Sequence, residues 1–196
     1  MIDQEKTAQE LMAELANDAS HQQKLKEKEQ QRVLLEQELC EDERQLVAEF
    51  QSKGVLISSV WDLVNSKENY QAAIPTLVAH LEKPHHARIS EGIVRALTTP
   101  TAAGIATEPL IGLFRSTVDA GSELKWLVGA AIAETATPAS AKTIVGLIND
   151  EKHGRGRAFL PLGLIHLPKD EARSILERLT SHPAMGESAS KAIALL

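Results

Sequence analysis

The stretch that says most about the fold spans residues 73–97 and has the sequence AIPTLVAHLEKPHHARISEGIVRAL. Leu77 and Leu81 lie four residues apart, which places them on one face of a helix. Pro84 then interrupts this pattern, because proline is poorly tolerated inside a helix. A second apolar pattern follows and ends at Leu97. The stretch therefore predicts two helices joined by a short turn.

The same two-helix pattern recurs along the chain. The first helices carry pairs of apolar residues four positions apart, at Leu46 and Phe50, Leu77 and Leu81, Leu110 and Phe114, Ile144 and Ile148, and Ile175 and Leu179. The second helices end on apolar residues at Val64, Leu97, Ile132, Leu164 and Leu196. Successive offsets are 31 to 34 residues in the first series and 32 to 35 in the second. Because one helical pair cannot cover its own apolar face, we expect neighbouring pairs to stack around a continuous core.

These observations predict an all-α fold, a right-handed α-α superhelix of about five helical hairpins with an N-terminal helical extension at residues 1–41. The hairpins are expected near residues 42–65, 71–99, 107–137, 139–167 and 171–196. In the extension, Thr7–Glu10 and Ser20–Gln23 fit the capping-box pattern of helix starts, and Gly54 is expected to end the second, long helix. That helix is either a solvated helix with a narrow apolar seam or part of a dimeric coiled coil. It either folds back onto the repeats or projects from them.

Residues 73–81, a turn containing Pro84 and an alanine-rich second helix resemble the HEAT repeats of the phycobilisome-lyase type. The resemblance extends over about residues 42–196 and implies an α-solenoid that serves as an interaction scaffold, without indicating a ligand. HEAT repeats also tend to form a ladder of aspartate and basic residues between units. Pairing of Asp119 with Lys125, and of Asp150 with Arg155 or Arg157, would resemble this ladder.

The composition argues against a nucleic-acid-binding protein. The chain has 196 residues and a net charge of −6, and only 3% of its residues are aromatic. Residues 1–54 contain 7 basic and 13 acidic side chains, whereas residues 55–196 contain 14 of each. Proteins that grip nucleic acid usually carry a basic excess that neutralises phosphates. We therefore expect another protein, and not nucleic acid, as the partner.

The sequence offers little support for a cofactor, a metal or a membrane association. Cys40 is the only cysteine, so neither an intrachain disulfide nor a multi-thiolate metal site is possible. His80, His85 and His86 cluster in sequence but lack accompanying ligands at metal-binding spacing. The start of the chain lacks a secretory-signal pattern, and the longest apolar run, residues 126–133, is too short to span a bilayer. We expect a cytoplasmic protein without bound cofactor or metal.

Two turns between paired helices are locally basic. One contains His85, His86 and Arg88, and the other contains Arg155 and Arg157. Equivalent turns of a solenoid lie along one edge, so these residues are candidates for a partner-binding rim that attracts anions. The alternative is that they are ordinary solvated turns, with Arg157 belonging to the ladder between repeats.

Three further candidates for partner binding lie on second helices. Trp126 is predicted to point away from the apolar face of its helix, where it would contact a partner or pack on the next repeat. Glu91 and Arg95 are predicted on the outward face of the preceding second helix, a face that is either a binding surface or merely solvated. Trp61, by contrast, is predicted to belong to the core.

No motif of a nucleophile elbow, a phosphate-binding loop or a dinucleotide fingerprint is present, so no catalytic residue is predicted. We expect a protein–protein interaction module, such as an inhibitor, an immunity protein or an adaptor. The alternative is a DNA-binding enzyme resembling the HEAT-like alkylpurine DNA glycosylases. A third possibility, an accessory lyase for a tetrapyrrole, rests on resemblance alone. The sequence leaves the oligomeric state open.

Overall fold

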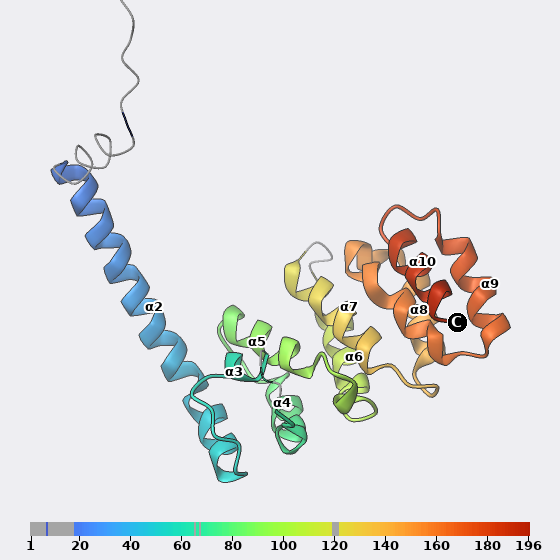
Figure 1. Ribbon diagram of the computed structural model, residues 1–196, viewed down its shortest axis with the longest axis horizontal. Coiled ribbons are helices and arrows are strands. Elements are labelled where there is room, and N and C mark those ends of the chain that lie inside the picture. The colour runs from blue at the N-terminus through green and yellow to red at the C-terminus, as the bar shows by residue number, and fades with distance from the viewer. Residues whose placement is uncertain (1–6, 8–17, 65, 67, 119–121) are drawn as a thin grey trace, which may run out of the picture. The chain divides into compact units, whose positions relative to one another are not determined.

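The computed structural model describes Thr7 and residues 18–64, 66, 68–118 and 122–196, and this part of the chain is all-helical, without a strand (Figure 1). The fold class is thus all-α, as predicted. The chain divides into two compact units, residues 1–41 and 42–196. None of the described helices combines the length and the apolar content that crossing a membrane requires.

The long helix α2 (Ala19–Ser52) begins directly after Asp18. The Asp18 carboxylate accepts hydrogen bonds from the backbone N–H groups of Ser20 (2.8 Å) and His21 (3.3 Å). The predicted cap at Ser20 is therefore wrong, because an aspartate two residues earlier satisfies the first free N–H groups. The other predicted helix start, Thr7–Glu10, lies outside the described residues except for Thr7.

Gly54 ends α2, as predicted. Its φ of 79° is a left-handed conformation that glycine adopts without a steric penalty. The Gly54 N–H donates to the Gln51 carbonyl and the Val55 N–H donates to the Phe50 carbonyl, both at 3.0 Å. This pair of bonds is a Schellman motif, which satisfies carbonyl groups at the end of a helix.

Residues 42–196 form successive helical pairs. After the end of α2, the first helices are α4 (Ile74–His80), α6 (Thr107–Ser116), α8 (Ala141–Asn149) and α9 (Lys169–Leu179). The second helices are α3 (Trp61–Val64), α5 (Ala87–Leu97), α7 (Glu123–Thr135), η3 (Glu151–His166) and α10 (Gly186–Leu195). Two short 3-10 turns, η1 (Gln71–Ala73) and η2 (Pro100–Ala102), precede α4 and α6.

The second helices contact one another in chain order. Within the pairs, α4 packs on α5, α6 on α7, α8 on η3 and α9 on α10. Between the pairs, α3 packs on α5, α5 on α7, α7 on η3 and η3 on α10 (Figure 1). We call this series the second-helix layer. Its continuity means that neighbouring pairs bury apolar surface against each other.

Most of the predicted anchors are buried. Those with an exposed fraction of at most 1% are Leu46, Phe50, Leu77, Leu97, Leu110, Phe114, Ile132, Ile144, Ile148 and Leu164. Leu81 and Leu196 are only half-buried. In α3, the second helix of the first pair, the predicted register is wrong by one residue, because Leu63 is buried and Val64 is half-buried.

The register also differs in the last pair. Ile175 and Leu179 are half-buried, whereas Ala172 and Leu176 are fully buried in their place. The sequence pattern missed this shift because alanine is small and does not stand out as an anchor, although close helix packing favours it.

The second helix of the fourth pair is irregular. η3 has 3-10 geometry and is interrupted at Gly154, which has φ 49° and ψ −131°. Pro161 lies within its later part. Gly154 thus forms a kink between two helical segments, and the ordinary α-helix expected here is not formed. This kink precedes the residues that pack against α7.

Glycines bring the backbones of the second-helix layer close together. A Cβ atom on Gly129 of α7 would lie 2.3 Å from the carbonyl oxygen of Gly156 in η3. A Cβ atom on Gly156 would lie 2.9 Å from Cγ of Lys125. On α5, a Cβ atom at Gly92 would lie 2.7 Å from a methyl group of Val60. Side chains at these positions would push the helices apart.

Replacement of Gly129 with alanine is expected to lower the free energy of unfolding by about 2–3 kcal/mol, because the added methyl group meets backbone that cannot rotate away. Gly146 of α8 provides the matched control, since a Cβ there meets nothing within 4 Å. Gly146→Ala should raise the stability by about 0.5–1 kcal/mol through helix propensity. Urea unfolding followed by far-UV circular dichroism measures both changes, and equal effects would contradict the close packing of α7 on η3.

Candidate functional site

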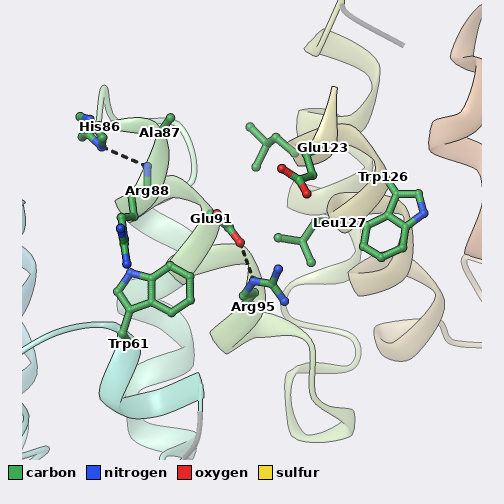
Figure 2. Close-up of a pocket in the computed structure, with 10 residues that line it drawn as sticks. Trp61, His86, Ala87, Arg88, Glu91, Arg95, Glu123, Trp126 and Leu127 are labelled. Atoms are coloured by element: carbon green, nitrogen blue, oxygen red, sulfur yellow. Dashed lines mark hydrogen bonds and ion pairs between the residues drawn. The ribbon is translucent and has the colours of Figure 1, made fainter. Parts of the chain in front are cut away.

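A hollow of about 510 Å³ opens on the second-helix layer, between α5 and α7 (Figure 2). Arg88, Glu91 and Arg95 line it from α5. Glu123 and Trp126 line it from α7. These five side chains come from two consecutive helical pairs, so the hollow exists only when the pairs are stacked.

A second hollow, of about 420 Å³, adjoins the first. It is lined by Ser122, Glu123, Trp126 and Arg155. Glu123 and Trp126 line both hollows. We call the two hollows together the second-helix groove. The groove extends from α5 across α7 to the first part of η3.

Trp126 lies where the two hollows meet. Its exposed fraction is 37%, which is high for so large an apolar side chain. The indole contacts the ring of Phe159 in η3 edge-on, with ring centroids 4.8 Å apart. Trp126 therefore packs on the next pair, as one of the two alternatives has it, and part of its ring also faces the groove; contact with a partner stays a prediction.

Trp61 reaches the groove from α3, and the prediction that it is a core residue is wrong. The ring is only half-buried and lines the first hollow. One edge of the ring packs closely on Gly92 of α5, where an added Cβ atom would lie 3.1 Å from its Nε1. Its Nε1 is buried and has no hydrogen-bond partner among the described residues. The Arg88 guanidinium lies 6.0 Å from the centre of the ring, at the limit of a cation–π contact (Figure 2).

The position of α3 is set by a buried carboxylate. Glu43, near the end of α2, has an exposed fraction of 5%. Its Oε2 accepts hydrogen bonds from the Val60 N–H and from the Ser59 hydroxyl, both at 3.0 Å. Bonds to a charged acceptor are stronger than neutral ones, so this contact fixes the start of α3 and with it Trp61.

The structure brings together most of the residues predicted to bind a partner. The first hollow is lined by His86, Arg88, Glu91, Arg95 and Trp126, and the second by Trp126 and Arg155. Glu91 and Arg95 form an ion pair of 2.8 Å (Figure 2). Whether these residues bind a partner stays a prediction. His85 and Arg157 do not line the groove.

His85 is held inside a chain of hydrogen bonds instead of facing solvent. Its side chain is 6% exposed, with Nδ1 at 3.2 Å from Oδ1 of Asp42. Its Nε2 lies 3.0 Å from Nδ1 of His80, whose Nε2 lies 2.8 Å from Nζ of Lys83. His80 Nε2 also lies 3.3 Å from Oε1 of Glu49. The network ties the end of α2 to α4 and to the turn before α5.

Arg157 is also turned inward, with an exposed fraction of 8%. It donates hydrogen bonds to the carbonyl groups of Ile148 (2.7 Å) and Gly154 (3.2 Å). Asp150 pairs with Lys152 at 2.7 Å, so the expected pairing of Asp150 with Arg155 or Arg157 is wrong. Asp119 lies outside the described residues.

Two buried polar residues beside the groove escaped the sequence prediction. Lys125 is 2% exposed, and its ammonium group donates to the Thr117 carbonyl and lies 5.1 Å from the centre of the Phe114 ring. His153 is 1% exposed and packs on the same ring, with centroids 4.8 Å apart. Burial lowers the pKa of His153, and the Lys125 charge lowers it further. Sequence alone gives no signal for this burial, because lysine and histidine side chains are usually solvated.

The arrangement offers recognition chemistry more than bond-making chemistry. The groove combines two indole rings, guanidinium groups and carboxylates, which suit apolar contact and ion pairing. In the described part of the chain, no group of three or more His, Cys, Asp or Glu side chains is arranged to hold a metal ion. The chain matches no family model, no curated protein and no solved structure.

The buried histidines predict that the protein loses stability in acid. Burial lowers the pKa of both His80 and His153 below the ordinary value of about 6.5, so the unfolded chain takes up protons more readily than the folded one. The stabilising contribution is complete above pH 6.5 and is lost as pH falls through the folded-state pKa values. Each histidine contributes up to about 1.4 kcal/mol per pH unit to the slope of the free energy of unfolding against pH between these values.

His153→Phe should make this pH dependence shallower without abolishing it, because His80 remains. Replacement of the exposed His166 with glutamine is the matched control and should leave the slope unchanged. Urea unfolding at pH values from 8 to 5 measures the slopes. If the stability of His153→Phe depends on pH as steeply as that of the wild type, His153 is not buried in its neutral form.

Proposed function

We propose that this chain is a HEAT-like repeat protein, a right-handed superhelix of about five helical pairs, that binds another protein through its second-helix groove. The repeat character is supported by the two sequence registers and by the chain-order contacts of the second helices. In such arrays each repeat stacks on its neighbours, and the stack presents an extended binding surface.

The observation that carries the proposal is the position of Trp126. A tryptophan with more than a third of its surface exposed is costly in water, and here it stands where two hollows meet. Contact with Phe159 fixes the ring, so a partner would lose little conformational entropy by packing on it. Tryptophan is enriched among the residues that contribute most to protein–protein binding.

The groove also supplies the polar border that protein interfaces need. The Glu91–Arg95 pair lies on the α5 wall, and Arg155 lies at the η3 end. Interfaces typically surround an apolar centre with polar groups that remain accessible to solvent. The groove has this composition. Its position over α5, α7 and η3, which adjoin one another in the second-helix layer, suits a segment of a partner protein, such as the inhibitory surface of a toxin or the docking segment of an adaptor target.

Trp126→Ala is expected to weaken partner binding about 30-fold, corresponding to about 2 kcal/mol, because the variant removes the apolar centre of the groove. Proteins retained from a native-cell lysate by the immobilised full chain identify the partner. The affinity of the purified pair is then measured by isothermal titration calorimetry.

Leu56→Ala is the matched control, since Leu56 is an apolar side chain with 86% exposure that does not line the groove. Equal affinity of Trp126→Ala and Leu56→Ala for the partner would reject the groove as the binding surface. Salt-dependent binding of duplex DNA at low ionic strength, unaffected by Trp126→Ala, would favour the DNA-binding alternative instead.

A further inference from the structure

The charged groups of the second-helix groove differ in whether they already have a partner. Glu91 and Arg95 neutralise each other across 2.8 Å. Arg88 faces the Trp61 ring, and Arg155 is exposed at the other end of the groove. Within the described ranges, neither the Arg88 nor the Arg155 guanidinium has a carboxylate at ion-pair distance. The groove therefore has a cationic group free to pair with a ligand in each of its two hollows.

Glu123 lies between these two cations in the order of the helices. It belongs to the first turn of α7, where a carboxylate is favourable beside the free N–H groups of the helix start. Because it lines both hollows together with Trp126, it makes the centre of the groove unfavourable for an anion. The groove thus has a cation, then an indole beside a carboxylate, then a second cation.

The spacing of the helices sets the length of a matching ligand. Arg88 lies on α5 and Arg155 on η3, two steps along the second-helix layer. Packed helices are about 8–10 Å apart, so the two side chains are separated by roughly 16–20 Å. An extended peptide advances about 3.3 Å per residue and covers this distance with about six residues.

We propose that the groove binds an acidic segment of a partner protein, with carboxylates at Arg88 and Arg155 and a large apolar side chain between them against Trp126. The two carboxylates lie about six residues apart in an extended segment. The central position excludes Asp and Glu because Glu123 faces it. This inference rests on the proposed function and specifies the chemistry of its partner.

A protein ligand fits this pattern better than a nucleic acid. A nucleic-acid strand presents a phosphate at every nucleotide, and Glu123 would face one of them. Tight binding to nucleic acid also requires many phosphate contacts, whereas the groove has two guanidinium groups without a carboxylate partner in the described part of the chain, and the net charge is −6. Acidic side chains in a peptide can instead be confined to the two ends.

Selection of a random dodecapeptide phage library on the immobilised full chain tests this inference. The expected peptides carry Asp or Glu at two positions about six residues apart, with Trp, Phe or Leu between them. A synthetic peptide of the most enriched sequence should bind at least 10-fold more weakly to Arg88→Glu/Arg155→Glu by calorimetry. Selection on that variant should enrich Lys or Arg at the same two positions.

Arg115→Glu/Lys142→Glu is the charge-matched control, because it reverses two exposed cations on the first helices α6 and α8. It should bind the peptide like the wild type. Should the glutamate variant fail to fold by circular dichroism, Arg88→Gln/Arg155→Gln removes the charges with less disturbance.

The remaining outcomes separate this inference from the proposed function. Peptides that require Trp126 but show no acidic enrichment would overturn the inference and leave the proposed function intact. Absence of any peptide whose binding depends on Trp126 would overturn both. Binding of a 20-base-pair DNA duplex provides the third outcome. If the duplex binds the wild type but not Arg88→Glu/Arg155→Glu, and the selection yields no acidic peptides, the inference is overturned in favour of nucleic acid.

Discussion

The close approach of α7 and η3 is the constraint on which the candidate site depends. Gly129 faces the carbonyl group of Gly156 so closely that no side chain fits between them. This approach brings Trp126 onto Phe159 and places Arg155 beside the start of α7. The groove is therefore a consequence of backbone packing, and the exposed residues that line it are positioned by residues that have no side chain.

The same approach explains the buried polar groups beneath the groove. The stem of Lys125 packs over Gly156, and its ammonium group is satisfied by a backbone carbonyl and by the face of Phe114. His153 shares that ring from the other side of the interface. At the opposite end of the layer, the carboxylates of Asp42 and Glu43 hold the turn before α5 and the start of α3. Each wall of the groove is thus anchored by a polar contact.

The sequence predicts the helical pairs well because apolar side chains repeat with the pairs, and helix periodicity follows directly from burial. It also predicts that Glu91, Arg95 and Trp126 face outward, since the apolar residues of α5 and α7 identify the buried face of each helix and these three residues lie on the opposite face. It fails where an orientation depends on a neighbouring element. The position of Trp61 depends on the hydrogen bond that holds the start of α3 to Glu43, and His85 is turned inward by a carboxylate 43 residues earlier. Neither contact has a local signature.

Trp61 and Trp126 are the only two tryptophans of the chain, and both line the first hollow. The tryptophan fluorescence of the protein therefore originates entirely at the candidate site. Indole emission depends on solvation, so anything that displaces water from the groove alters the spectrum without an attached dye. The two tryptophans are thus an intrinsic fluorescent probe of the candidate site.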